Sequence, residues 1–394
     1  MNIIEKVKSC FDEDITVKIS KHDDYSNELF IYKDDAELIF DWKEEESEKT
    51  VEEVKYFFDY IYRPDVGIIN QDYVEIPVTV PNPLFMELLN GKRVSDKLGD
   101  KNIYYEISEA STHFHYLIRL HHKKLLDYGP NDWLTTLKIY NVDTIIKTNY
   151  ESKIFIEKSI NLAKTILFDL YKDNDILLKL INLDKIVNQD YSSSNPYEKI
   201  KKNLKDIKEQ KVQTVYEDDL LNYYLRATYM DNSQFKYLAY YQVLECIFEE
   251  VYLNETIDSI KQIITSKWFN KYKNEDIKKV IELVEKYNNS KHDREKLRLV
   301  LEKFFKGKIH SESFYLANKD IIKLLKNMEL IKKDKDLNDL QKLSNIIYDF
   351  RCECTHSNRG FSFRTSFDNT TEELNNYIKL IKKISERIIM NYNT

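Results

Sequence analysis

Apolar and polar residues alternate in short stretches in the first part of the chain, and they follow a helical period in the rest. Alternating or β-branched stretches predict strands. They lie at residues 17–20, 28–32, 36–40, 74–80 and 104–107. Between them, residues 50–62 predict a helix, because Thr50 and Glu53 have the spacing of a capping box and Pro64 follows. We therefore expect a mixed domain of helices and strands over residues 1–145.

From residue 154 onward, apolar positions recur every three or four residues, which predicts helices almost throughout. A Tyr-Ser-Ser-Ser-Asn-Pro run at residues 191–196 predicts a linker inside a helical connector that covers residues 146–215. Three strongly amphipathic segments follow, at residues 235–252, at 337–354 and from 370 to the end. We expect residues 216–394 to form an all-α bundle, which places the whole chain in the α+β class.

Composition excludes several classes of protein. The 394 residues carry a formal net charge of −7, which argues against a general nucleic-acid coat because nonspecific binding uses many Lys and Arg contacts to phosphate. Any nucleic-acid site must then be local. The sequence shows no apolar run of about 18 residues and no signal-peptide core. Its four cysteines are too scattered for a disulfide framework. We expect a cytoplasmic protein that does not associate with membranes.

The segment at residues 337–354 leads into the run Arg351-Cys-Glu-Cys-Thr-His356. An Arg fork stabilises phosphate charge and a His moves protons near neutral pH, so this pair suits phosphodiester chemistry without a metal. On a straight helix a separation of five residues rotates a side chain by about 140° and advances it by about 7.5 Å. The two side chains then do not lie together. We expect the helix to loosen before Gly360 and a second copy to complete the site across a two-fold dimer.

The Tyr-Tyr-Gln-Val-Leu-Glu segment at residues 240–245 precedes, by about a hundred residues, an Ile-Tyr-Asp-Phe-Arg-x4-His helix and a final amphipathic helix. This arrangement over residues 216–394 resembles the HEPN superfamily, and most nearly its ApeA-like bacterial branch associated with phage defence. The resemblance implies a homodimeric, metal-independent endoribonuclease without a cofactor, acting as an antiviral or abortive-infection effector on RNA. One position departs from the pattern, since Cys352 stands where the family often has Asn or another polar residue.

The resemblance also implies roles for individual residues. His356 would be the general acid or base for attack of the ribose 2′-hydroxyl, and Arg351 would hold the scissile phosphate. Glu245 is the candidate to orient Arg351 through an ion pair. Further candidate contacts to RNA are Arg359, Arg364 and Asn358. The domain over residues 1–145 would sense or regulate, in response to a phage-derived trigger or a regulatory partner.

Two other interpretations stay open. One is a non-catalytic helical module for dimerisation or interaction, in which the motif pair only makes a structural hydrogen bond. The other is a metal-dependent enzyme that uses histidines of the first domain. If residues 112–120 form a strand, His113 and His115 lie on one face, and His121 and His122 follow closely.

Overall fold

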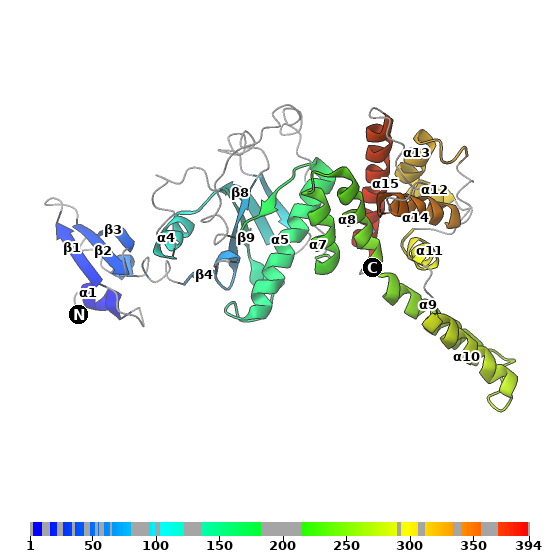
Figure 1. The fold of residues 1–394 in the computed structure, drawn as a ribbon. Coiled ribbons are helices and arrows are strands. Elements are labelled where there is room, and N and C mark those ends of the chain that lie inside the picture. The colour runs from blue at the N-terminus through cyan, green and yellow to red at the C-terminus, as the bar shows by residue number, and fades with distance from the viewer. Residues whose placement is uncertain are drawn as a thin grey trace. The chain divides into compact units, whose positions relative to one another are not determined.

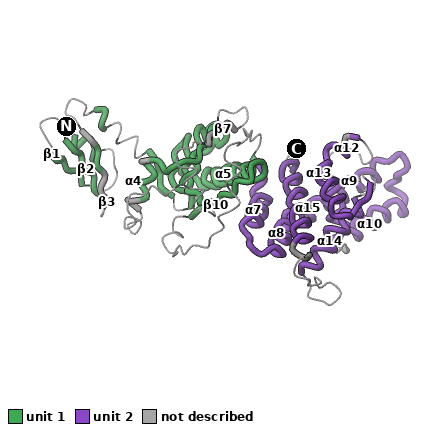
Figure 2. Tube along the Cα trace, turned by 90° about the horizontal axis from the view of Figure 1, so that it is seen from above, with its two compact units in different colours: residues 1–215 green, residues 216–394 purple. Residues whose placement is uncertain are grey.

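The computed structural model describes most of the chain. The described residues are 3–9, 16–21, 27–33, 36–42, 48–51, 54, 59–63, 65–79, 94–98, 103–121, 135–182, 215–289, 293–305, 312–333, 340–355 and 369–392. The chain divides into two compact units, residues 1–215 and 216–394 (Figure 2). The second unit begins where the sequence places the all-α bundle, whereas the first domain and the connector share one unit.

The first unit begins with a short helix and a three-stranded antiparallel sheet (Figure 1). These elements are α1 (Ile3–Lys8), β1 (Thr16–Lys21), β2 (Asn27–Lys33) and β3 (Ala36–Trp42). The sheet order follows the chain. Leu29 and Ile31 of β2 are buried in a cluster that also includes Val7 of α1 and Phe114. This cluster joins the first sheet to the rest of the unit.

The second sheet of this unit is also antiparallel and has the order β4-β5-β6-β9-β8-β7, with β10 paired to β6. Its strands are β4 (Ile61–Arg63), β5 (Gly67–Ile69), β6 (Tyr73–Thr79), β7 (Val94–Leu98), β8 (Ile103–Glu109), β9 (Thr135–Tyr140) and β10 (Lys179–Leu180). Gly67 has a φ of 128°, and a Cβ there would lie 2.2 Å from the carbonyl oxygen of Glu75. Only glycine allows β5 to approach β6 this closely.

The described part of this unit also contains the helical residues 48–51 and 54 and three further helical elements. These three elements are α4 (Thr112–His121), the 3₁₀ turn η3 (Val142–Thr144) and α5 (Lys153–Asn174). Helix α5 begins at the N-cap Ser152, whose hydroxyl accepts from the Phe155 N–H at 3.2 Å, and ends at Asp175 in the left-handed conformation. Phe155 and Phe168 of α5 are fully buried. The sequence predicts this helix at the correct place.

The second unit is entirely helical in its described residues (Figure 1). Its helices are α7 (Asp218–Thr228), α8 (Ser233–Glu245), α9 (Phe248–Ile264), α10 (Asn274–Asn289), α11 (Asp293–Phe304), α12 (Glu312–Ala317), α13 (Lys319–Asn327), α14 (Gln341–Thr355) and α15 (Asn369–Asn391). Helix α8 packs against α7, α14 and α15. The predicted α+β class is confirmed, and the five predicted strands match β1, β2, β3, β6 and β8.

Buried hydrogen bonds fix how the helices of the second unit pack around α8. The Tyr237 hydroxyl donates to the Ile347 carbonyl of α14 at 2.9 Å. Ser385 of α15 donates from its hydroxyl to the Tyr240 carbonyl at 3.1 Å. The Tyr224 hydroxyl of α7 donates to Glu386 of α15 at 2.8 Å. Each bond satisfies a polar group inside the core and pins one neighbour of the central helix.

Two helix predictions need correction. The segment at residues 235–252 is not one helix, because α8 ends at Glu245 and α9 starts at Phe248. Ile247 adopts φ −107° and ψ 3°, and its side chain is buried. The helix expected over residues 50–62 does not reach its predicted end, since Ile61 begins β4, where Ile61 pairs with Ile69. Tertiary packing overrides the local pattern at both places.

The predicted linker at residues 191–196 lies outside the described residues. None of the helices in the described ranges has both the length and the apolar character that a bilayer crossing requires.

Candidate active site

Arg351 lies in the last turn of α14, at a position fixed by its aromatic neighbour. The ring of Phe350 stacks on Tyr377 of α15, with centroids 3.6 Å apart and an interplanar angle of 12°. It also meets Tyr237 of α8 edge-on at 4.8 Å. These contacts and the bond from Tyr237 to Ile347 hold the end of α14 between α8 and α15. The backbone that carries the guanidinium is therefore rigid.

Glu245 faces Arg351 from the end of α8. The Arg351 Nη2 atom lies 3.4 Å from the Glu245 Oε1 atom, which is an ion pair with a long hydrogen bond. The sequence predicts this contact, and its geometry depends on the end of α8, because the turn at Cys246 makes Glu245 the last helical residue. The side chains keep 26% and 34% of their exposure. Since Arg carries five N–H donors and one contact to Glu245 is present, the exposed part of this guanidinium can still donate to a ligand.

The electrostatics of the pair follow from its partial burial. Burial raises the pKa of Glu245, and the Arg351 guanidinium offsets this rise only in part. Burial alone would lower the pKa of Arg351, but the Glu245 carboxylate and the Tyr241 phenol outweigh it and the pKa is raised. The Arg351 guanidinium also lies 5.9 Å from the centroid of the Tyr241 ring. A fixed cation thus sits on an aromatic surface beside a carboxylate, which is an environment that suits an oxyanion.

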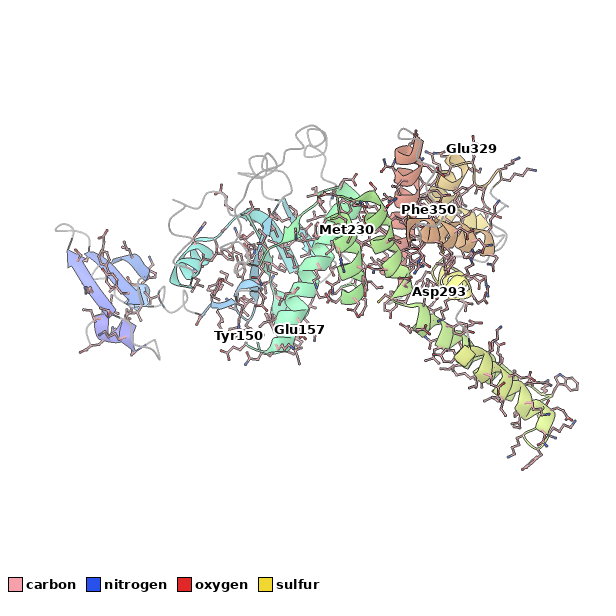
Figure 3. The ribbon with its side chains drawn as sticks, viewed as in Figure 1. Tyr150, Glu157, Met230, Asp293, Glu329 and Phe350 are labelled. Carbon is pink, nitrogen blue, oxygen red and sulfur yellow. The ribbon has the colours of Figure 1, made fainter. Side chains whose placement is uncertain are left out.

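The beginning of α11 contributes two charged residues that the sequence analysis missed. The Asp293 carboxylate acts electrostatically on Glu245 and further raises its pKa. Arg294 stacks over the Tyr348 ring, with its guanidinium carbon 4.9 Å from the centroid, and forms an ion pair with Asp349. Figure 3 labels Asp293 on α11 and Phe350 on α14. A second guanidinium on the Arg351 helix face is a further candidate for a phosphate contact.

One sequence signal pointed toward this second arginine. Tyr348 precedes Arg351 by three residues, so both side chains lie on the same face of α14. A half-buried aromatic ring on the face of a functional Arg can receive a second cation above its ring. The chain position of that cation, however, depends on how α11 packs on α14, which the sequence does not specify.

The remaining predicted site residues lie outside the described residues. They are His356, Asn358, Arg359 and Arg364. Helix α14 is regular up to Thr355, whose hydroxyl donates to the Arg351 carbonyl at 3.1 Å. The structure therefore brings Arg351 and Glu245 together, while the place of His356 relative to them stays a prediction.

The two motif cysteines are half-buried in α14. Burial is the main cause that raises the pKa of the Cys354 thiol to about 12, and the Glu353 carboxylate adds to this rise. Such a group stays protonated near neutral pH and is neither a nucleophile nor a good metal ligand. Within the described ranges, no cluster of three or more His, Cys, Asp or Glu side chains has the geometry of a metal site.

His113 and His115 of the first unit do not share a face. Residues 112–121 form helix α4 and not the strand that the alternative metal site requires, so His113 and His115 point in different directions. His113 packs 5.0 Å from the Tyr60 ring, and burial lowers its pKa. His122 lies outside the described residues. The strand interpretation is wrong, and with it the geometric basis for a zinc site.

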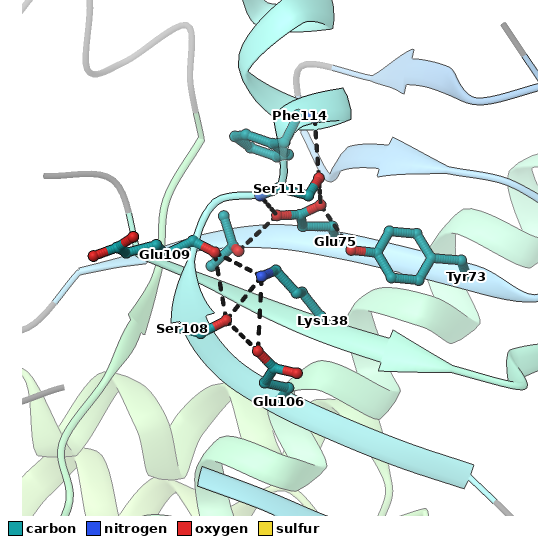
Figure 4. A network of polar contacts seen from close by, with 9 residues as sticks. Tyr73, Glu75, Glu106, Ser108, Glu109, Ser111, Phe114 and Lys138 are labelled. Carbon is teal, nitrogen blue, oxygen red and sulfur yellow. Dashed lines mark hydrogen bonds and ion pairs between the residues drawn. The ribbon is translucent and has the colours of Figure 1, made fainter. Parts of the chain in front are cut away.

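The buried carboxylate of Glu75 acts electrostatically on His113, and Figure 4 shows its hydrogen bonds. Glu75 accepts hydrogen bonds from the Tyr73 hydroxyl at 2.8 Å and from the Thr136 hydroxyl at 2.7 Å. It also accepts from the Ser111 N–H at 2.8 Å and the Ser111 hydroxyl at 2.5 Å. Glu75 is fully buried, and its oxygens are saturated by donors. It links strands β6 and β9 to the start of α4 and is best explained as a structural group.

Comparison with protein-family models, with curated proteins and with solved structures gave no match.

Proposed function

We propose that this chain is a metal-independent endoribonuclease of the HEPN type, whose second unit carries the active site. The single observation that carries the proposal is the ion pair between Arg351 and Glu245, which joins two helices far apart in the sequence. This ion pair holds a partly exposed guanidinium near the end of the helix that leads to His356. From the resemblance we also propose an anti-phage or abortive-infection role, with the domain over residues 1–145 as sensor or regulator.

In this proposal RNA supplies its own nucleophile. His356 takes the proton of a ribose 2′-hydroxyl, and the O2′ atom attacks the adjacent phosphorus while the bond from phosphorus to O5′ breaks. Arg351 stabilises the charge on the equatorial phosphate oxygens. The O5′ leaving group receives a proton from a histidine imidazolium, of the same copy or of a second copy in a homodimer. The products are a 2′,3′-cyclic phosphate and a 5′-hydroxyl.

Cleavage by matched variants tests this function. Wild type, Arg351→Ala and His356→Ala are purified, checked for folding by circular dichroism and incubated with total RNA in EDTA. We expect cleavage by the wild type and a loss of about a thousandfold in each variant, as for removal of a group that acts in the transition state. Arg298→Ala is the matched control, because the Arg298 guanidinium is bound by Glu295 and Glu302 of its own helix.

Three outcomes separate the alternatives. Unchanged cleavage in His356→Ala contradicts the proposal. Cleavage by the wild type that EDTA abolishes favours a metal-dependent enzyme. Absence of cleavage together with a dimer that Arg351→Ala dissociates favours the non-catalytic module for dimerisation.

A further inference from the structure

Helices α9 and α10 form an antiparallel hairpin whose closed end carries exposed aromatic and basic side chains. The rings of Tyr252, near the start of α9, and Tyr287, near the end of α10, stack at 5.4 Å, which sets the antiparallel pairing. The opposite end of the hairpin is the turn between Ile264 and Asn274. Figure 1 shows α10 running away from the bundle formed by the other helices of this unit. We call residues 264–273 the hairpin tip.

The aromatic rings of the hairpin tip face solvent. Trp268 is 90% exposed and Tyr272 is 83% exposed, the highest values among the exposed large hydrophobic side chains of the described residues. Phe269 between them is half-buried. Exposed Trp and Tyr side chains add no buried apolar area that would stabilise the fold. Their exposure therefore points to a ligand with a flat apolar face.

Basic residues alternate with these rings. Lys267, Lys271 and Lys273 are all exposed and stand within seven consecutive positions of a chain whose net charge is −7. The ammonium group of Lys271 lies 5.2 Å from the centroid of the Tyr272 ring. In the part of the chain that the structure describes, Lys267 and Lys271 form no ion pair with a carboxylate. These lysines are therefore available to phosphate groups.

The hairpin tip is closed by its own hydrogen bonds. The Asn270 N–H donates to the Asp276 carboxylate at 3.0 Å, and Lys279 donates to the same carboxylate at 2.9 Å. The Asn270 side chain accepts from the Tyr272 N–H at 2.9 Å. Asp276 is thus occupied in closing the turn, and a ligand would meet a turn whose backbone is already fixed by hydrogen bonds. Such preorganisation lowers the entropy cost of binding.

Two hollows flank Trp268. One has a volume of about 420 Å³ and is lined by Ile263, Phe269 and Leu283 among others. The other has a volume of about 650 Å³ and is lined by Lys267, Lys271, Tyr272 and Lys273. Trp268 lines both hollows. Both hollows are shallow and open to solvent, which leaves the indole ring accessible to a ligand from either side.

We propose that the hairpin tip binds single-stranded RNA, with bases stacked on Trp268 and Tyr272 and phosphates on the three lysines. Proteins that bind single-stranded nucleic acid generally combine aromatic rings with cationic side chains, because every base has a flat face and every nucleotide carries a phosphate. A membrane-inserting tip would instead present a continuous apolar surface, whereas lysines separate the rings here. The inference rests on the proposed function only for the identity of the substrate as RNA.

Binding of a fluorescent, single-stranded 20-nucleotide oligouridine tests the inference by anisotropy. All proteins carry Arg351→Ala so that cleavage does not interfere. We expect the added pair Trp268→Ala and Tyr272→Ala to weaken binding about tenfold or more, since one stacked base accounts for that loss. Lys267→Gln, Lys271→Gln and Lys273→Gln together should reduce the slope of log K against log salt by about 2. Controls are Phe235→Ala, 61% exposed on α8, and Lys278→Gln on α10.

Three results would overturn the inference. The first is oligouridine binding that the aromatic pair of substitutions leaves unchanged. The second is cosedimentation with vesicles of phosphatidylcholine and phosphatidylglycerol that the same pair abolishes while RNA binding persists. The third is conversion of a dimer to a monomer by that pair, measured by light scattering, with unchanged RNA binding. Tip-dependent binding without any cleavage by the unmutated chain would instead contradict the proposed function alone.

Discussion

Two carboxylates with the same chemistry occupy opposite environments in this molecule. Glu75 of the first unit is fully buried and accepts four hydrogen bonds from Tyr73, Ser111 and Thr136. Glu245 of the second unit keeps a third of its exposure and meets Arg351 at 3.4 Å. All hydrogen-bonding positions of the Glu75 carboxylate that the structure shows are occupied, so it cannot bind a ligand as well. The partly exposed ion pair of Glu245 and Arg351 can. The difference shows why the second carboxylate, although less well ordered by contacts, marks the candidate active site.

Replacing Glu75 should have the largest effect on stability. Glu75→Ala leaves the hydroxyls of Tyr73 and Thr136 and both donors of Ser111 buried without their acceptor. Since each such group costs about 1–3 kcal/mol, we expect the free energy of unfolding of the first unit to fall by at least about 3 kcal/mol. Urea denaturation followed by circular dichroism measures this. Glu109→Ala, on the exposed end of β8, is the control and should change stability by less than about 0.5 kcal/mol. Equal losses of stability in Glu75→Ala and Glu109→Ala would contradict the structural role of the buried Glu75 carboxylate, and with it the contrast to Glu245.

Replacing Glu245 should change activity and not stability. Glu245→Gln removes the charge that orients Arg351, and we expect cleavage to fall about tenfold while the free energy of unfolding changes by less than about 1 kcal/mol, because the pair is partly exposed. The exposed Glu255→Gln on α9 is the control. A loss of activity that only follows a loss of folding would contradict a positioning role.

The pH profile gives a second readout for Glu245. Its pKa is raised by burial, so the folded state takes up the proton more readily than the unfolded chain. The stability from this group is therefore greatest at low pH and falls as pH rises from the ordinary Glu pKa through the raised one. Activity has the opposite sign, because only the ionised carboxylate holds Arg351. Protonation of His356, the proposed general base, gives an acid limb in both proteins. We expect this limb to be shallower in Glu245→Gln, because one group titrates there and not two, and an unchanged limb would contradict this role.

Removing the hydrogen bond that holds α14 against α8 should have a smaller effect on stability and activity. Tyr237→Phe removes the bond to the Ile347 carbonyl, which lies one turn before Arg351, and keeps the ring against Phe350. We expect a loss of about 1 kcal/mol in the free energy of unfolding, with a matching mild decrease in cleavage. Thermal and urea unfolding measure the first quantity. Tyr223→Phe on α7, where the ring is half-buried, is the comparison and should leave both unchanged.

Arg294 should contribute least. Arg294→Ala removes a guanidinium that stacks on Tyr348 at the surface beside Arg351. We expect RNA binding to weaken about threefold and the salt slope to decrease by about 0.7, as for one phosphate contact. Anisotropy at several salt concentrations measures both quantities. If Arg294→Ala weakened RNA binding more than Arg351→Ala does, the main phosphate contact would lie on α11 and not on α14.

The sequence predicts much of the second unit because its helices bury one face. The predicted period on α14 runs from Leu340 to Cys354, and its members are buried up to Phe350, whereas Cys354 is half-buried. On α15 the predicted period is buried from Ile378 to Ile388. The break after Glu245 has no such signal, because Tyr241, Leu244, Phe248 and Val251 keep the helical period across it. All four are buried, and the chain turns there without glycine or proline. Packing of the whole bundle, and not the local pattern, determines the position of Glu245.

The first unit was harder to predict because some of its strands lack alternation. Residues 135–139 of β9 are buried on both faces, but Thr135, Thr136 and Lys138 are polar, so the sequence shows no apolar run there. Strand β7 reads Val-Ser-Asp-Lys-Leu, which has no clear period. Conversely, residues 112–120 alternate enough to suggest a strand but form α4. Of the site, the ion pair of Glu245 with Arg351 was predictable, whereas Asp293 and Arg294 depend on tertiary packing.

The chemical ends of the cleaved RNA test the central claim most directly. A defined single-stranded RNA is incubated with the wild-type chain in EDTA, and the products are analysed by mass spectrometry. Attack by the 2′-hydroxyl, assisted by Arg351 and His356, predicts 2′,3′-cyclic phosphate and 5′-hydroxyl ends that are absent with Arg351→Ala. Ends with a 3′-hydroxyl and a 5′-phosphate, or intact RNA with a folded wild-type protein, would contradict the account.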